Sequence, residues 1–323
     1  MKARQKESWI KGKNNNNLDG KSGIKSGIIQ KVNKIINEEL IFLNKHFNYD
    51  LSQYYNCNLI YGSCFLVFFN LEEIKSSSCD KSIFLNNYFS CKKNENSVKF
   101  DTLKIINLIT GFELLGIGLN VHGTSENIIN DNYLKKDNLK DDSIQNSDIK
   151  YTIELLFGDI FYSRAVLYLI NYGDFLVFED IIKSLLKLHR ARLIIHQKLA
   201  KFYSKVSVER INDNFIEDIM QIKDLNALLK SAFLTGLGAS DFDFYNNNTC
   251  LRIIENIALL KTYNDIENKL QEIRQQIKNN NINKYLNFTC NEKKSTTVKI
   301  KNDIDLVKPE WLKNNFKNLM KLF

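Results

Sequence analysis

Proline is almost absent from this 323-residue sequence and glycine is sparse: there is one proline, Pro309, and there are 13 glycines. Both residues interrupt regular secondary structure, and a β-sandwich needs many turns that contain them. Their scarcity argues against such a fold and favours long helices. With 44% hydrophobic and 25% charged residues, the composition is far from that of disordered chains. We therefore predict an all-α protein, built as a single large helical bundle.

Clustered cysteines are also lacking. The six cysteines include no C-x-x-C pair and no His/Cys spacing typical of zinc sites. The sequence thus indicates neither a metal site nor a disulfide framework. Reduced thiols fit a cytoplasmic protein best, and we predict that location.

No hydrophobic run reaches the ~20 residues that a membrane-spanning helix needs. The nearest, LIYGSCFLVFFNL at 59–71, is too short and interrupted, and we expect it to be a buried helix. Residues 1–23 are basic but lack the apolar core of a secretory signal, so they are expected to form a flexible tail. No transmembrane segment is predicted, and peripheral contact with a membrane stays open.

The sequence has no block of charge of one sign, although its net charge is +8. Lys and Arg are mixed with Asp and Glu along the chain. The lysine excess is explained equally well by a biased composition that also supplies many Asn and Ile residues. Nucleic acid is therefore not a predicted partner.

Apolar residues recur at helical spacing along most of the chain. The predicted helices cover 24–47, 101–122, a segment that begins at 151, 174–203, 213–237, 249–277 and 311–323. Two polar stretches, 76–98 and 123–150, are predicted to be loop insertions. The residues between 278 and 311 are mostly polar. Residues 24–323 would form one helical domain.

The segment LLFGDIFYSRAVLYLIN at 155–171 carries a glycine inside a helical pattern. Gly costs about 1 kcal/mol relative to Ala in a helix interior, so it usually marks the close approach of another helix. We predict such a helix contact at Gly158, Asp159 and Ala165. Asp159 is expected to pair with Arg164 or to cap a neighbouring helix.

The run G-D-x-x-x-S-R-A in this segment resembles the G-D-[YL]-L-x-[AS]-R-A helix of the trans-polyprenyl diphosphate synthase family. Three further stretches resemble helices of that family and follow its order: FELLGIGLNVHG before this run, then LLKSAFLTGLGA and IALLKTYNDIEN after it. The resemblance extends from residue 112 to residue 268. It implies a helical bundle of the isoprenoid synthase type.

In that family, two Asp-rich motifs on facing helices hold Mg²⁺ ions, which bind an allylic diphosphate and stabilise the departing pyrophosphate. In this sequence Gly-Thr-Ser-Glu-Asn follows His122 where the first motif would lie, and Glu126 is its one acidic residue. In the second motif region, Asn264, Asp265 and Asn268 stand at the positions of the family's three aspartates. Asp265 is the one aspartate kept at these positions.

One or two carboxylates do not provide the near-octahedral oxygen ligands that Mg²⁺ requires. We therefore expect no metal site and little or no prenyl transfer by this chain alone, with Mg²⁺ bound by a catalytic partner. Lys261 also replaces the Gln that precedes the second motif in the family. The resemblance implies that Lys230 and Ser231 contact a diphosphate, although a lysine that faces solvent fits the sequence equally well.

This pattern of loss resembles the non-catalytic small subunit of two-component heptaprenyl diphosphate synthases. It implies a subunit that joins a catalytic homologue, as a heterodimer or heterotetramer, in the biosynthesis of isoprenoid quinone side chains. Two alternatives stay open. One is a divergent active synthase, in which Glu126 and Asp265, with Asp141 and Asp142, would assemble a metal site. The other is a helical interaction protein that kept only the fold, in which His122 is a helix cap or a core hydrogen-bonding group.

Overall fold

The structure, a computed structural model, shows helices joined by shorter segments. It describes residues 23–47, 49–51, 54–55, 59–69, 102–135, 141–172, 174–203, 223–239, 248–276 and 280–323. All regular structure within these ranges is helical, and they contain no strand. The predicted all-α fold is therefore confirmed.

The structure assigns the following helices. The α-helices are α1 (Gly23–Phe47), α2 (Ile60–Leu66), α4 (Thr102–Lys135), α5 (Asp141–Tyr172), α6 (Phe175–Tyr203), α8 (Ala227–Ala239), α9 (Asn248–Gln276), α10 (Asn280–Asp305) and α11 (Glu310–Leu319). The 3₁₀ helices are η4 (Lys223–Asn226) and η6 (Met320–Leu322).

Several predicted helices agree closely with the observed ones. The predictions at 24–47, 174–203 and 249–277 correspond to α1, α6 and α9. Asp174 caps α6, because its Oδ1 accepts the backbone N–H groups of Leu176 at 2.9 Å and Val177 at 3.2 Å. The proposed tail, the polar stretch 76–98 and the first ten residues of the predicted helix 213–237 lie outside the described residues.

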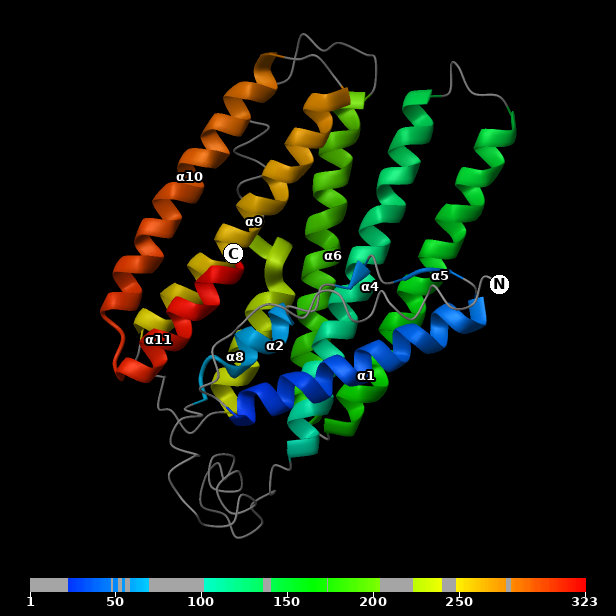
Figure 1. Ribbon diagram of the computed structural model, residues 1–323. Helices are drawn as coiled ribbons and strands as arrows, with labels where there is room; N and C mark the ends of the chain where they lie inside the picture. The colour runs from blue at the N-terminus through cyan, green and yellow to red at the C-terminus, as the bar shows by residue number, and fades with distance from the viewer. Residues whose placement is uncertain are drawn as a thin grey trace, which may run out of the picture.

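Helix α4 occupies the middle of the arrangement (Figure 1). It forms an antiparallel pair with α5, and α1, α2 and α6 also contact it. Helices α9 and α10 form a second antiparallel pair at the opposite edge of the molecule, with α10 outermost. The short helices α2 and α8 pack against each other between the two pairs.

Helix α4 is buried on all sides along its first half. Its buried side chains there include the two polar residues Thr110 and Glu113 besides many apolar ones. Its stretch Leu103–Gly123 is long and apolar enough to cross a membrane, yet 83% of the hydrophobic window is buried inside the protein. A helix that is apolar all round is typical of the centre of a large core.

Small residues let α4 and α5 approach closely at two levels, seven residues apart on each helix. A Cβ atom on Gly111 would lie 3.3 Å from the carbonyl oxygen of Ala165. A Cβ atom on Gly118 would lie 3.1 Å from the carbonyl oxygen of Gly158. Side chains at either glycine would therefore push the helices apart. The close helix contact predicted at Gly158 is present.

The polar stretch 123–150 is not the loop that the sequence suggested. Helix α4 continues to Lys135 and α5 begins at Asp141, so most of this stretch is helical. Extending a helix costs little once its first turns are held in place, and here the core holds the apolar halves of both helices. The stretch also contains no proline. Polarity was therefore the wrong criterion for a loop.

Helix α10 was not predicted, because its sequence is mostly polar. Its inner stripe mixes apolar residues with threonines at helical spacing. The buried residues of this stripe are Ile282, Tyr285, Thr289, Thr296, Ile300 and Ile304. The hydroxyl of Thr289 donates to the carbonyl oxygen of Tyr285 at 3.0 Å, which allows its burial. Counting threonine as part of the buried stripe would have revealed the helix.

Two glycines of α8 provide a matched test of this packing. A Cβ atom on Gly236 would lie 2.2 Å from the backbone oxygen of Phe65, whereas one on Gly238 would meet nothing within 4 Å. We expect Gly236→Ala to lower the free energy of unfolding by about 2 kcal/mol or more, since backbone must move. Gly238→Ala should be neutral or stabilise by up to about 1 kcal/mol. Urea unfolding measures both, and equal effects would contradict the predicted close contact.

Candidate functional site

His122 lies on α4 at the position where the resembling family begins its first Asp-rich motif. Its side chain is 14% exposed, and its Nε2 lies 3.3 Å from Oδ1 of Asp159 on α5. A Cβ atom on Gly158 would lie 2.4 Å from the same Nε2, so the glycine makes the space that the ring fills. Gly158 and Asp159 thus act together to seat one imidazole.

A row of polar side chains continues from His122 across α5 to α6. The rings of His122 and Tyr162 have centroids 5.1 Å apart, and the Tyr162 hydroxyl lies 3.1 Å from Nε2 of His189. Arg192, one turn further along α6, donates from Nη1 to the carbonyl oxygen of Leu119 at 2.7 Å. Two imidazoles, a phenol and a guanidinium therefore line one face of α4, α5 and α6.

The sequence analysis did not select Tyr162 or Arg192 as site residues. Tyr162 lies four residues after Gly158, hence on the same helix face, and this spacing could have indicated it. Arg192 gave no comparable signal, because its partner is a backbone carbonyl on another helix. Glu126 belongs to α4, and Asp141 and Asp142 belong to α5, but their side chains lie outside the described part of the structure.

Arg164 does not pair with Asp159, which corrects one of the expected roles for Asp159. Its guanidinium instead contacts Glu39 of α1, with both Nε and Nη2 lying 2.9 Å from Oε2. The Tyr168 hydroxyl donates to the other oxygen of Glu39 at 3.1 Å. Burial and the nearby Glu39 carboxylate raise the pKa of Tyr168. Glu39 therefore fastens α1 to α5.

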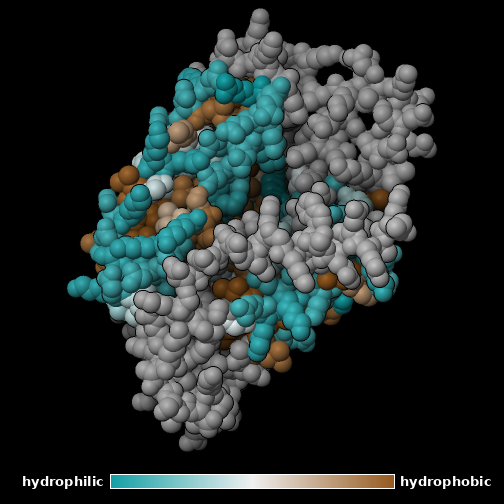
Figure 2. Space-filling view, in the orientation of Figure 1, coloured by the Kyte–Doolittle hydropathy of each residue, from teal (hydrophilic) through white to brown (hydrophobic). Residues whose placement is uncertain are grey.

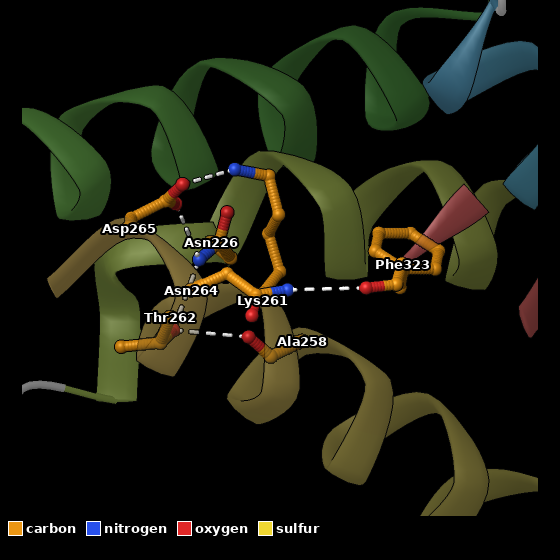
Figure 3. Close-up of polar contacts among 7 residues, drawn as sticks. All are labelled: Asn226, Ala258, Lys261, Thr262, Asn264, Asp265 and Phe323. Atoms are coloured by element: carbon orange, nitrogen blue, oxygen red, sulfur yellow. Dashed lines mark hydrogen bonds and ion pairs between the residues drawn. The ribbon is translucent and has the colours of Figure 1, made fainter. Parts of the chain in front are cut away.

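The second motif region lies on α9 and is held by contacts within the chain (Figure 3). Asp265 forms an ion pair with Lys261 on the preceding turn. Asn226 of η4 reaches the other Asp265 oxygen at 3.4 Å and donates to the Thr262 hydroxyl at 2.9 Å. Asn264 donates to the carbonyl oxygen of Phe323 at 3.3 Å. The charge of the Asp265 carboxylate is thus balanced by a lysine of the same helix.

Other polar residues near this region on α9 point to different partners. Glu267 forms an ion pair with Lys293 of α10, and Asn268 is exposed. Within the described part of the chain, no three His, Cys, Asp or Glu side chains gather where they could hold a metal ion. Of the three residues expected to share the second motif, Asn264 therefore faces the C-terminus, Asp265 faces η4 and Asn268 faces solvent.

Lys230 and Ser231, the expected diphosphate contacts, lie elsewhere. Lys230 forms an ion pair with Glu255 of α9 at 3.0 Å, and Ser231 is buried in α8. Glu255 precedes Asp265 by ten residues on one helix, which corresponds to roughly 15 Å of helical rise. The structure does not bring Lys230 to the second motif region.

Tyr61 lies between the two regions. Its ring fills the space beside Gly116 of α4, where a Cβ atom would lie 2.3 Å from it. Burial is the largest cause of the raised pKa of the Tyr61 phenol, and the Glu113 carboxylate raises this pKa further. The guanidinium of Arg192 lowers it, and the carboxylate of Asp265 raises it. The arginine beside the first region and the aspartate of the second therefore both lie near one buried phenol.

Glu113 of α4 holds the backbone near the start of α2. Its Oε1 accepts the backbone N–H of Gly62 at 2.8 Å, near the start of α2. Burial raises the pKa of Glu113 to about 8, although the backbone N–H groups of Gly62 and Tyr61 lower it. The side chain is therefore largely protonated at neutral pH and serves as a hydrogen-bonding group of the core.

The raised pKa of Glu113 predicts a pH dependence of stability. An unfolded glutamate titrates near 4.5 and the folded one near 8. Between these values the unfolded chain has lost a proton that the folded chain keeps, so the free energy of unfolding falls as pH rises. Glu113→Gln keeps the acceptor oxygen but cannot ionise. It should remove a slope of up to about 1.4 kcal/mol per pH unit in this window.

Denaturant unfolding of wild type and Glu113→Gln at several pH values between 5 and 8 measures this slope. We expect the two stability curves to diverge as pH rises, with the variant the more stable at pH 8. Parallel curves would show that Glu113 ionises normally in the folded protein.

A double-mutant cycle tests the contact of Arg164 with Glu39. Because the guanidinium meets a carboxylate that is only 12% exposed, we expect a coupling energy of about 1 kcal/mol between Arg164→Gln and Glu39→Gln. The control cycle pairs Arg164→Gln with Asp159→Asn, and its coupling should be close to zero. A larger coupling in the control cycle would restore the Asp159 pairing and contradict the observed contact.

Comparison of the chain with protein-family models, curated protein sequences and solved structures finds no match. The interpretation of these two regions therefore depends on the residues of this chain and their contacts.

Proposed function

We propose that this protein is a non-catalytic subunit of a heteromeric long-chain polyprenyl diphosphate synthase. The observation that carries the proposal is the ion pair between Lys261 and Asp265. Asp265 is the one carboxylate kept at its place in the second motif. The ammonium group of Lys261, on the same helix, lies beside this carboxylate. Active members of the resembling family would need this carboxylate for a metal ion.

The chemistry explains why this pair matters. Ionisation of an allylic diphosphate builds negative charge on the leaving group, and divalent cations held by several carboxylates offset it. A lysine one turn from Asp265 neutralises the carboxylate and adds a positive charge at the place of a metal. The Asn226 amide satisfies the remaining oxygen. The region is stable without any ligand.

The scaffold around the two regions supports a role in assembly. The close approach of α4 and α5 at Gly118 and Gly158 is present although the acidic residues after His122 are not. Glycine inside a helix lowers its stability, so the glycines at 118 and 158 point to a requirement for the fold. The lysine at 261 points to the loss of a catalytic role. In the proposed complex the catalytic partner supplies the paired Asp motifs and binds Mg²⁺.

The test measures incorporation of isopentenyl diphosphate into long-chain product with farnesyl diphosphate and Mg²⁺. Three samples are compared: this chain alone, the D-D-x-x-D homologue of the same organism alone, and the two after co-purification. We expect product from the mixture only. Activity of this chain alone would overturn the proposal, and so would a homologue that is neither bound nor altered by it.

Lys261→Gln serves as a matched variant in the same assay. It removes the internal cation and restores the residue type found in the family. We expect the variant to stay inactive alone, because the first motif still lacks its paired aspartates, and to support the partner as wild type does. Turnover by the isolated variant would favour a divergent active synthase instead.

A further inference from the structure

The outward face of α10 carries an excess of positive charge. Residues 280–323 contain nine lysines and four acidic residues. The lysine face, as we name it, comprises the exposed residues Lys284, Phe288, Lys294, Val298, Lys299 and Lys301. These positions fall within one arc of the helix, opposite its buried stripe. Helix α10 forms the outer edge of the molecule, so this arc points away from the bundle (Figure 1).

The acidic residues of α10 do not neutralise this face. Glu292 interacts with Tyr263 of α9, and Asp303 forms an ion pair with Arg252 at 2.9 Å. Asp305, at the end of the helix, pairs with Lys313 at 3.2 Å. Each carboxylate thus has a partner on α9 or α11. Positive charge therefore dominates the outward side of α10.

Three lysines of the face have no such partner. Lys294, Lys299 and Lys301 are exposed and form no ion pair with any residue that the structure describes. Apolar side chains lie between the lysines: Phe288 is 42% exposed and Val298 is 56% exposed. In Figure 2 the edge formed by α10 is hydrophilic with separate hydrophobic patches along it.

We propose that the lysine face binds the surface of an anionic phospholipid membrane, with α10 lying flat on it. Lysines attract anionic headgroups, and apolar side chains between them enter the boundary with the acyl chains. From Lys284 to Lys301 the face is roughly 26 Å long at 1.5 Å per residue. The exposed Phe288 and Val298 distinguish this surface from a nucleic-acid site, where lysines contact phosphates without needing buried apolar groups.

Sedimentation with vesicles tests the proposal with the full chain and no substrate. Vesicles of phosphatidylcholine alone are compared with vesicles that also contain phosphatidylserine. We expect binding to the anionic vesicles only, and weaker binding at higher salt. The triple variant Lys294→Gln, Lys299→Gln and Lys301→Gln should bind on the order of 100-fold more weakly, since each lysine near an anionic surface contributes a factor of roughly five.

A control triple variant removes the same charge elsewhere: Lys31→Gln, Lys34→Gln and Lys187→Gln, all at exposed positions of α1 and α6. It should bind the anionic vesicles as wild type does. A double variant, Phe288→Ser with Val298→Ser, should bind about tenfold more weakly, because it loses apolar burial in the interface. Equal loss in both lysine variants would show that net charge alone drives binding and would overturn the proposal.

Competition separates a membrane from a nucleic acid. Single-stranded RNA is added to the vesicle assay and its binding is also measured directly. If RNA binds through the same three lysines and the apolar double variant binds RNA and vesicles normally, the lysine face is a nucleic-acid site and the membrane proposal fails. Because the assay contains neither a synthase nor its substrates, its outcome does not depend on the proposed function.

Discussion

The close approach of α4 and α5 is the constraint on which the rest of the structure depends. Gly118 meets the backbone of Gly158, and two turns away Gly111 meets the backbone of Ala165. The side chain of Leu169 lies beside Gly111 and that of Tyr162 beside Gly118, so an added side chain would meet both a neighbouring side chain and the facing backbone. The other helices that contact α4 are arranged around this pair. The seat of the His122 ring beside Gly158 is a direct consequence.

Several polar side chains of the bundle find their partners within the chain. Glu39 fastens α1 to α5 through Arg164 and Tyr168, and Glu113 supports the start of α2. On α9, Lys261 neutralises Asp265. Burial of a charge without a partner costs several kcal/mol, so internal partners stabilise the ligand-free fold.

The two proposals concern neighbouring helices, because the second motif region lies on α9 and the lysine face lies on α10, which packs against it. The side chains of Lys261 and Asp265 are each 30% exposed on α9, whereas the lysine face lies on the outward side of α10 at the edge of the molecule. Asp303 pairs with Arg252 of α9, and Asp305 pairs with Lys313 of α11 although its own side chain is 65% exposed, while Lys294, Lys299 and Lys301 have no ion-pair partner among the described residues.

The helical class and the close packing at Gly158 could be predicted from the sequence. Scarce proline, apolar periodicity and a glycine within a helix are local properties, and each has one dominant structural consequence. The polarity of the sequence led to wrong predictions at 123–150 and at α10. At 123–150, α4 and α5 extend beyond apolar halves that the core holds in place. In α10, threonines form part of the buried stripe.

Only the tertiary structure decided the partners of the polar side chains. Arg164 contacts Glu39, 125 residues away in the sequence, although Asp159 is nearer along the chain. Lys230 meets Glu255, which places it away from Asp265. A charged side chain has several candidate partners in any sequence, and the packing of helices far apart in the chain selects one of them.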